Sequence, residues 1–215
     1  MEDRETRDKI LTGAQSLFLK YGIRSVSMDD IARHLSISKK TIYQYFADKD
    51  EIVTVVSAYH LENDKKVFEE IKGKSRNAVD ELVKIAACIK DEFKRLNPML
   101  LFDLQKYHTK AWHLWLEHKQ DFVRQSIISN LQQGIEEGFF RAELNAEIIG
   151  IARLELVQLT FDDRVFSSTR YSLAEINHQL FDHFAYGLFT DRGRKMYEKY
   201  KNEPVNNNDL IPNNK

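Results

Sequence analysis

Residues 27–49, SMDDIARHLSISKKTIYQYFADK, constrain the fold of this 215-residue chain more than any other stretch. Their pattern predicts two short helices joined by a tight turn. Ser27 offers an oxygen that can cap the first helix, and Asp30 follows three residues later, where an acid suits the positive helix end. Ser38 offers a second cap, and Ile42 would face inward on the second helix. This arrangement is typical of a helix-turn-helix.

The side chains left exposed on the second helix suit DNA. They are cations, a hydroxyl, an amide and aromatic rings with phenol tips, which match phosphates and base edges in a major groove. No acidic residue occurs between Ile31 and Ala47, whereas Arg33 is basic, as are the two lysines that follow Ser38. We therefore predict a DNA-binding set that consists of Ser27, Ser38, Lys39, Lys40, Thr41, Tyr43, Gln44, Tyr45 and Lys49.

At these residues the chain resembles the tetracycline-repressor (TetR) family of bacterial regulators. The resemblance is carried by Ile31-Ala32, Ser38, Thr41, Ile42-Tyr43-Gln44-Tyr45-Phe46 and Lys49. Ser36 and Lys40 depart from the family pattern, because each stands where glycine is common. A serine in a left-handed turn would cost about 1 kcal/mol, which a packed motif tolerates. Lys40 adds a phosphate or base contact, so this departure affects the expected target sequence and not the assignment to this class of regulator.

The composition of the chain is that of an ordinary globular protein, with 30% charged residues and a net charge of −1. A DNA-binding protein with this balance must concentrate its cations locally, and charge alone would equally fit a neutral protein with a solvated helix face. The single Cys88 lies in an apolar run and is expected to be a buried thiol. The N-terminus lacks the apolar core of a signal peptide, and no apolar run reaches about 18 residues, so we expect a cytoplasmic protein without a membrane partner.

Long amphipathic stretches and only three prolines predict an all-α fold. We expect a three-helix DNA-binding head over residues 1–48, a larger helical ligand-binding and dimerisation domain over 49–201, and a disordered asparagine-rich tail over 202–215. The helical periodicity gives about nine helices in all. Outside the two helices of residues 27–49, they are expected at 4–21, 50–72, 77–96, 99–107, 110–137, 146–166 and 173–189.

Two further sites are predicted in the larger domain. Aromatic side chains gather in the sequence around a helix–helix corner, which favours an apolar pocket with a few polar tips, although ordinary core packing remains the alternative. The pocket set is Phe93, Phe102, Tyr107, His108, Trp112, Trp115 and Phe161. The resemblance implies that the last two predicted helices join those of a second subunit. The dimer-interface set is Gly150, Leu156, Ile176, Leu180, Phe184 and Gly187.

The resemblance implies a homodimeric transcriptional regulator, with repression favoured over activation, that a small-molecule effector releases from a palindromic double-stranded operator. The alternative is a helical adaptor whose head docks a protein and has no operator of its own. No phosphate-binding glycine loop, GxSxG or HExxH motif occurs, so we expect no enzyme activity, no metal site and no cofactor.

Overall fold

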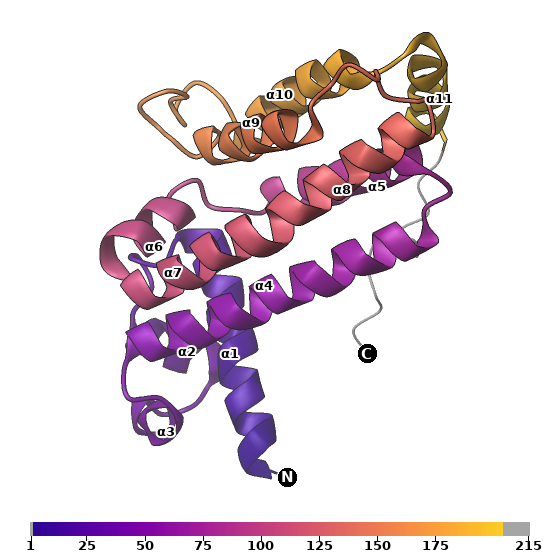
Figure 1. Ribbon diagram of the computed structural model, residues 1–215. Helices are drawn as coiled ribbons and strands as arrows, with labels where there is room; N and C mark the ends of the chain where they lie inside the picture. The colour runs from indigo at the N-terminus through magenta and orange to yellow at the C-terminus, as the bar shows by residue number, and fades with distance from the viewer. Residues whose placement is uncertain (1, 204–215) are drawn as a thin grey trace. The chain divides into compact units, whose positions relative to one another are not determined.

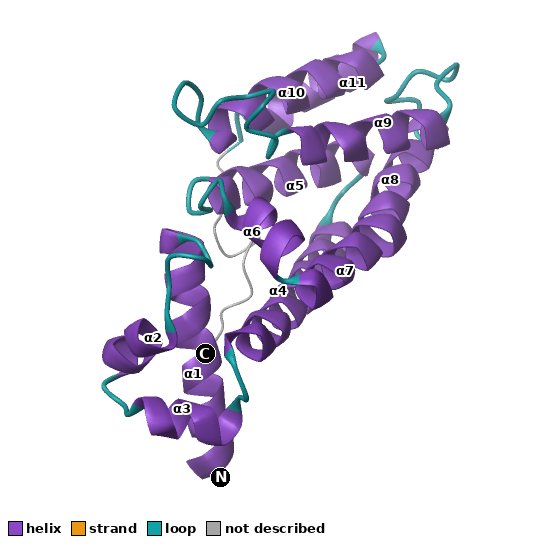
Figure 2. Ribbon diagram, turned by 90° about the vertical axis from the view of Figure 1, so that its left-hand side faces the viewer, coloured by secondary structure: helices purple, strands orange, loops and turns teal. Residues whose placement is uncertain are grey.

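The computed structural model describes residues 2–203, and its regular structure is helical throughout (Figure 1). Figure 2 shows helices joined by loops, and the described residues contain a single isolated antiparallel bridge, between Phe140 and Phe189. These residues form two compact units. The first holds the chain up to Glu62 together with Arg95–Glu117, and the second holds Asn63–Lys94 together with the chain from His118 onward. The all-α prediction is confirmed.

The first unit begins with the three helices expected for the head: α1 (Glu2–Tyr21), α2 (Met28–Leu35) and α3 (Lys39–Tyr45). Ile10, Ala14 and Phe18 recur every four residues on α1 and are buried. They share one core with α2 and α3. Gly22 ends α1 in the left-handed conformation, with φ +80°, and its N–H donates to the carbonyl of Phe18 at 2.9 Å, as the sequence predicted.

The same unit contains the beginning of α4 (Lys49–Lys74), with α6 (Leu100–Tyr107) and α7 (Thr109–His118). Leu104 and Ala111 are buried in the core that backs α2 and α3. Asp103, also buried, accepts a hydrogen bond of 3.0 Å from the backbone N–H of Arg24. The predicted 1–48 head is therefore contained in a larger compact unit, to which α6 and α7 contribute.

The second unit is arranged around α5 (Ala78–Phe93), which contacts α8 (Arg124–Glu136), α10 (Leu173–Leu188) and α11 (Asp191–Lys201). The helix α9 (Ala146–Leu159) packs against α8 and α10. The core of this unit is aromatic as well as aliphatic, and its most buried members include Val79, Leu131, Phe140, Ala185 and Leu188.

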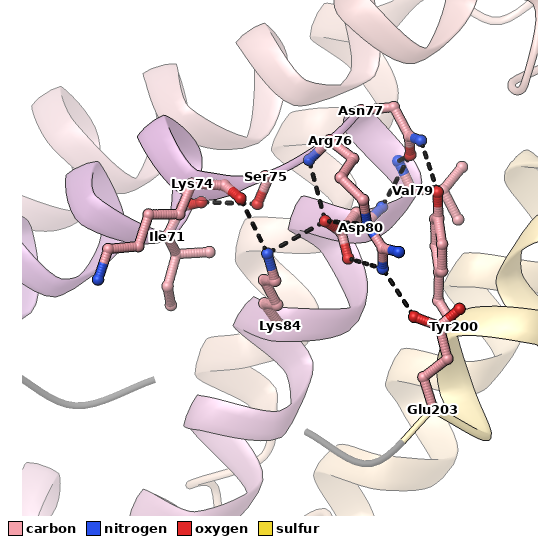
Figure 3. A network of polar contacts seen from close by, with 10 residues as sticks. All are labelled: Ile71, Lys74, Ser75, Arg76, Asn77, Val79, Asp80, Lys84, Tyr200 and Glu203. Atoms are coloured by element: carbon pink, nitrogen blue, oxygen red, sulfur yellow. Dashed lines mark hydrogen bonds and ion pairs between the residues drawn. The ribbon is translucent and has the colours of Figure 1, made fainter. Parts of the chain in front are cut away.

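A polar network joins the start of α5 to the end of α11 (Figure 3). The guanidinium of Arg76 donates two hydrogen bonds to the carboxylate of Asp80, each 3.0 Å long. The same guanidinium donates to Glu203 at 2.9 Å, and Asn77 donates to the hydroxyl of Tyr200 at 2.9 Å. These contacts fasten the last described helix to the rest of the second unit.

Three sequence predictions about the helices were wrong. The described residues form eleven α-helices where about nine were expected, because the helix expected at 110–137 is divided into α7 and α8 and because α11 was missed. The sequence of α11 is strongly charged, and the helix buries only Gly193, Tyr197 and Tyr200. The predicted continuous helix 110–137 is interrupted by a π-helical segment, Lys119–Val123. The helix expected to reach residue 166 ends at Leu159.

Most of the predicted disordered tail, from residue 204, lies outside the described residues. Within residues 2–203, no helix combines the length and the apolar character that crossing a membrane requires.

Candidate nucleic-acid interface

The first helix of the motif begins with the capping arrangement that the sequence indicated. The hydroxyl of Ser27 accepts a hydrogen bond of 3.2 Å from the backbone N–H of Asp30, and the Asp30 carboxylate accepts one of 2.9 Å from the backbone N–H of Ser27. Hydrogen bonds from the hydroxyl and the backbone of Ser27 lower the pKa of Asp30. Two otherwise unsatisfied donors are thereby paired, and the start of α2 is fixed.

The turn between α2 and α3 contains a residue in an unfavourable backbone conformation. Ser36 adopts φ +56° and ψ +38°, in the left-handed region. Its N–H donates to the carbonyl of Arg33 at 3.2 Å, and the next N–H, from Ile37, returns to the carbonyl of Ala32 at 3.0 Å. These two bonds close the C-terminal end of α2 in the way usually seen with glycine. The serine is thus held left-handed by the turn, as expected from its place in the motif.

The second helix of the motif, α3, presents one continuous exposed face. Ser38 caps it by accepting the N–H of Thr41 at 3.0 Å. On the inner side Ile42 is 0% exposed, and Phe46, which follows the helix, is 1% exposed. The opposite face carries four exposed side chains at helical spacings of one and four, namely Lys39, Lys40, Tyr43 and Gln44. Because this face has two cations, a phenol and a carboxamide, it can contact phosphates and base edges together.

One of the two lysines on this face is already paired within the head. The ammonium of Lys39 lies 2.7 Å from the carboxylate of Asp29 on α2. The hydrogen bond to Asp29 raises the pKa of Lys39. Lys40 makes no ion pair with another of the described residues. Sequence reasoning missed this difference, because it considered acids only between Ile31 and Ala47.

Three other members of the predicted DNA-binding set sit at the edge of the exposed face. Thr41 is half-buried, and its hydroxyl lies 2.8 Å from the hydroxyl of Ser38. The phenol of Tyr45 donates to Asp3 on α1 at 2.7 Å, so this ring supports the head as well. Lys49 begins α4, where burial lowers its pKa while the nearby Asp103 acts in the opposite direction.

The predicted pocket residues fall in different units. In the second unit, Phe93 and Phe161 form an edge-to-face pair with ring centroids 5.2 Å apart. The other five belong to the first unit, where Trp112 and Trp115 stack with centroids 4.9 Å apart. Buried His108 lies with its Nδ1 2.8 Å from Asp50 at the start of α4. The exposed members are Phe102 and Tyr107. That these seven residues form one pocket stays a prediction.

The predicted dimer-interface residues lie on α9 and α10. Gly150 is buried inside the unit, and a Cβ there would lie 2.8 Å from the side chain of Ile128 on α8. Ile176 is buried too, whereas Leu156, Leu180 and Phe184 are half-buried and Gly187 is exposed. The sequence did not single out Ile148 and Ile151, which are 63% and 40% exposed on one side of α9. An exposed apolar stripe of this kind is a common feature of subunit interfaces.

The comparison with known proteins agrees with the geometry of the head. Residues 10–56 match the family model described as bacterial regulatory proteins, tetR family. The HTH-type transcriptional regulator YvaF of Bacillus subtilis is 32% identical over 89 residues, which span 41% of this chain and 47% of that protein. The HTH-type transcriptional repressor KstR2 of Mycobacterium tuberculosis is 23% identical over 146 residues, which span 66% of this chain and 73% of that protein.

The likeness in fold extends beyond the head. The crystal structure of FadR from Thermus thermophilus, a TetR-family transcriptional repressor in complex with lauroyl-CoA, superimposes with a TM-score of 0.55 at 18% identity. The superposition covers 86% of this chain and 95% of that chain. The family match thus lies on the helices that include the exposed face of α3, and the shared fold includes the helices that follow. In the sequence of its head and in its fold, this chain is similar to the tetR family of bacterial regulatory proteins.

Proposed function

We propose that the protein is a homodimeric transcriptional repressor that binds a palindromic operator and is released from it by a small molecule. The observation that carries the proposal is the exposed face of α3, with Lys39, Lys40, Tyr43 and Gln44 opposite buried Ile42. Such a helix, capped at its N-terminus and backed by a packed core, is the part of a helix-turn-helix that enters the major groove.

The descriptions of two similar proteins support repression and release by a ligand. KstR2 is named a repressor, and the FadR structure holds lauroyl-CoA. In the first unit, Leu104 and Ala111 share a core with Ile42. Leu104 and Ala111 lie on α6 and α7, which therefore pack in the same core as α3. A ligand that stabilises a different packing of these helices would change how α3 is presented to DNA. The ligand can do so only to the extent that it binds that arrangement more tightly.

Dimerisation through α9 and α10 is supported by the exposed Ile148 and Ile151 and by the half-buried Leu180 and Phe184. A second subunit would cover this apolar surface. It would also supply a second head, and two heads reading a palindrome need to lie about 34–36 Å apart or at a multiple of that spacing.

Selection of bound duplexes from a random DNA pool, followed by titration of the enriched duplex with salt, tests this function. The expected result is a palindrome whose binding weakens steeply as salt rises, because phosphate contacts release counterions. Sedimentation of the free protein should show a dimer. A folded dimer that enriches no duplex, with or without small molecules extracted from cells, would overturn the proposal and favour a protein-docking head.

A further inference from the structure

Arg153 is a buried cation that forms no ion pair with any residue in the described range, 2–203. It lies on α9 in the second unit and is 4% exposed. Its Nη1 is buried and has no hydrogen-bond partner, and its Nη2 reaches only the side-chain oxygen of Asn177, at 3.5 Å. The group is therefore held inside the protein with its charge unpaired and most of its donors unused.

The neighbours of this guanidinium are aromatic rings on α10. Its central carbon lies 5.3 Å from the ring centroid of Phe181 and 5.5 Å from that of Phe184. Contacts between a cation and aromatic faces at this distance stabilise less than removal from water destabilises. Burial lowers the pKa of Arg153 to about 10, which still leaves the group charged at neutral pH.

Other buried ionisable groups of the second unit are paired or, like Glu81, accept a hydrogen bond from Asn130 while burial raises the pKa of the carboxyl. Asp80 is buried and is paired with Arg76 and Lys84. Lys119 is buried and donates to Glu155 at 2.8 Å. Buried charges in proteins are generally paired or bound to a ligand, because an uncompensated one strongly destabilises the fold. An unpaired arginine fits a position whose partner arrives from outside the chain.

We propose that Arg153 binds the carboxylate of the effector, so that the ligand is an apolar acid whose hydrocarbon part contacts Phe181 and Phe184. A planar guanidinium matches a carboxylate through two parallel hydrogen bonds. One arginine neutralises one negative charge, so a carboxylate leaves the site neutral, whereas a phosphate monoester would leave a second charge buried. That this ligand acts as the effector rests on the proposed function, whereas binding of the acid to Arg153 does not depend on DNA.

The test is thermal unfolding of the full-length protein without DNA, in the presence of straight-chain and arylalkyl carboxylic acids and of their primary amides. We expect at least one acid to raise the melting temperature, while its amide does not. In Arg153→Met the affinity for that acid should fall on the order of 100-fold. The free Arg153→Met protein should melt at a higher temperature than the wild type, because an unpaired buried charge has been removed. Arg170→Met is the matched control, since Arg170 is exposed and lies over the ring of Tyr171 at 5.1 Å. This variant should change neither the affinity for the acid nor the melting temperature of the free protein.

Three outcomes would overturn the inference. The first is that no acid stabilises the wild type, and the second is that acid and amide stabilise it equally. The third is that Arg153→Met lowers the melting temperature and dissociates the dimer, which would assign the missing anion to a second copy of the chain. Because no step uses DNA, loss of operator binding would leave these results unaffected, and failure here would leave the DNA-binding proposal standing.

Discussion

The ammonium of Lys39 donates a 2.7 Å hydrogen bond to the carboxylate of Asp29, so an acid of α2 neutralises the first cation of α3. The neighbouring Lys40 is exposed and makes no ion pair with the other described residues. Two adjacent lysines on the exposed face of α3 are therefore electrostatically different. If this face binds DNA as proposed, phosphate competes with Asp29 for Lys39 and meets Lys40 without competition.

This difference predicts unequal effects of removing the two lysines. Lys40→Ala should weaken binding to all duplexes and lower the slope of log affinity against log salt by about 1. Lys39→Ala should do less, because the wild-type charge is already compensated. Asp29→Asn should tighten binding and steepen the slope, since it frees Lys39. Fluorescence anisotropy with one labelled operator over a range of salt concentrations measures all three, and equal losses in the two lysine variants would contradict the assignment.

Gln44 is expected to affect which sequence is bound more than how tightly DNA is held. Its carboxamide is exposed on the same face as Lys40, and a carboxamide can pair with both hydrogen-bonding groups of adenine in the major groove. Gln44→Ala should relax the preference at one base pair of each half-site, with a loss of discrimination of about 1–3 kcal/mol.

The measurement for Gln44 is a repeated duplex selection, followed by affinities for the preferred and the altered operator. Lys40→Ala serves as the contrasting variant, because loss of a phosphate contact should leave the selected sequence unchanged. If Gln44→Ala enriches the same operator with undiminished discrimination, this face of α3 does not read bases through Gln44.

Features that depend on neighbouring residues in the chain were predictable from the sequence. The caps at Ser27 and Ser38 and the helix end at Gly22 follow from a few consecutive residues, and the structure has each of them. The same holds for the inward position of Ile42, which helical spacing determines. The helix α11 was missed because its buried face is narrow, with Tyr197 and Tyr200 among charged neighbours, and because contacts such as that of Tyr200 with Asn77 join residues distant in sequence.

Contacts between residues distant in sequence were not predictable in this way. His108 and Asp50 are 58 residues apart and their side chains approach to 2.8 Å. The pairing of Lys39 with Asp29 depends on the angle between two helices, which spacing does not give. The unpaired state of Arg153 is a property of the packed second unit as well, since the sequence around it, IARLEL, reads as an ordinary helix.

Ser36 offers a direct test of strain in the turn of the motif. Its φ of +56° is unfavourable for a side chain, whereas glycine adopts it readily. Ser36→Gly should stabilise the protein by roughly 0.5–1 kcal/mol. Gly22→Ala is the matched opposite change, because Gly22 has φ +80° and a Cβ there would meet nothing closer than 3.5 Å. It should destabilise by about 1 kcal/mol through backbone strain alone. Urea unfolding measures both, and a destabilised Ser36→Gly would show that the serine hydroxyl matters more than the turn.

The Arg76–Asp80 pair of Figure 3 predicts how stability depends on pH. Burial alone would raise the pKa of Asp80, but hydrogen bonds from Arg76 and Lys84 outweigh it and lower that pKa to about 2, from 3.8. Because the folded pKa lies below the unfolded one, the stabilisation is fully present above about pH 4 and is lost as the pH falls from there towards 2. Asp80→Asn should therefore cost roughly 1–2 kcal/mol at neutral pH, and the difference from the wild type should shrink in acid.

The free energy of unfolding of both proteins between neutral and acid pH provides this comparison. Asp162→Asn is the control, since Asp162 also pairs with an arginine, Arg164, but the guanidinium of that pair is 89% exposed. Its effect should be small at every pH, because exposed ion pairs contribute little. Parallel curves for Asp80→Asn and the wild type would show that the pKa of Asp80 is the same in the folded and the unfolded protein, so that its ionisation contributes no net stability. In that case the contacts with Arg76 and Lys84 would only offset the cost of burying the Asp80 carboxylate.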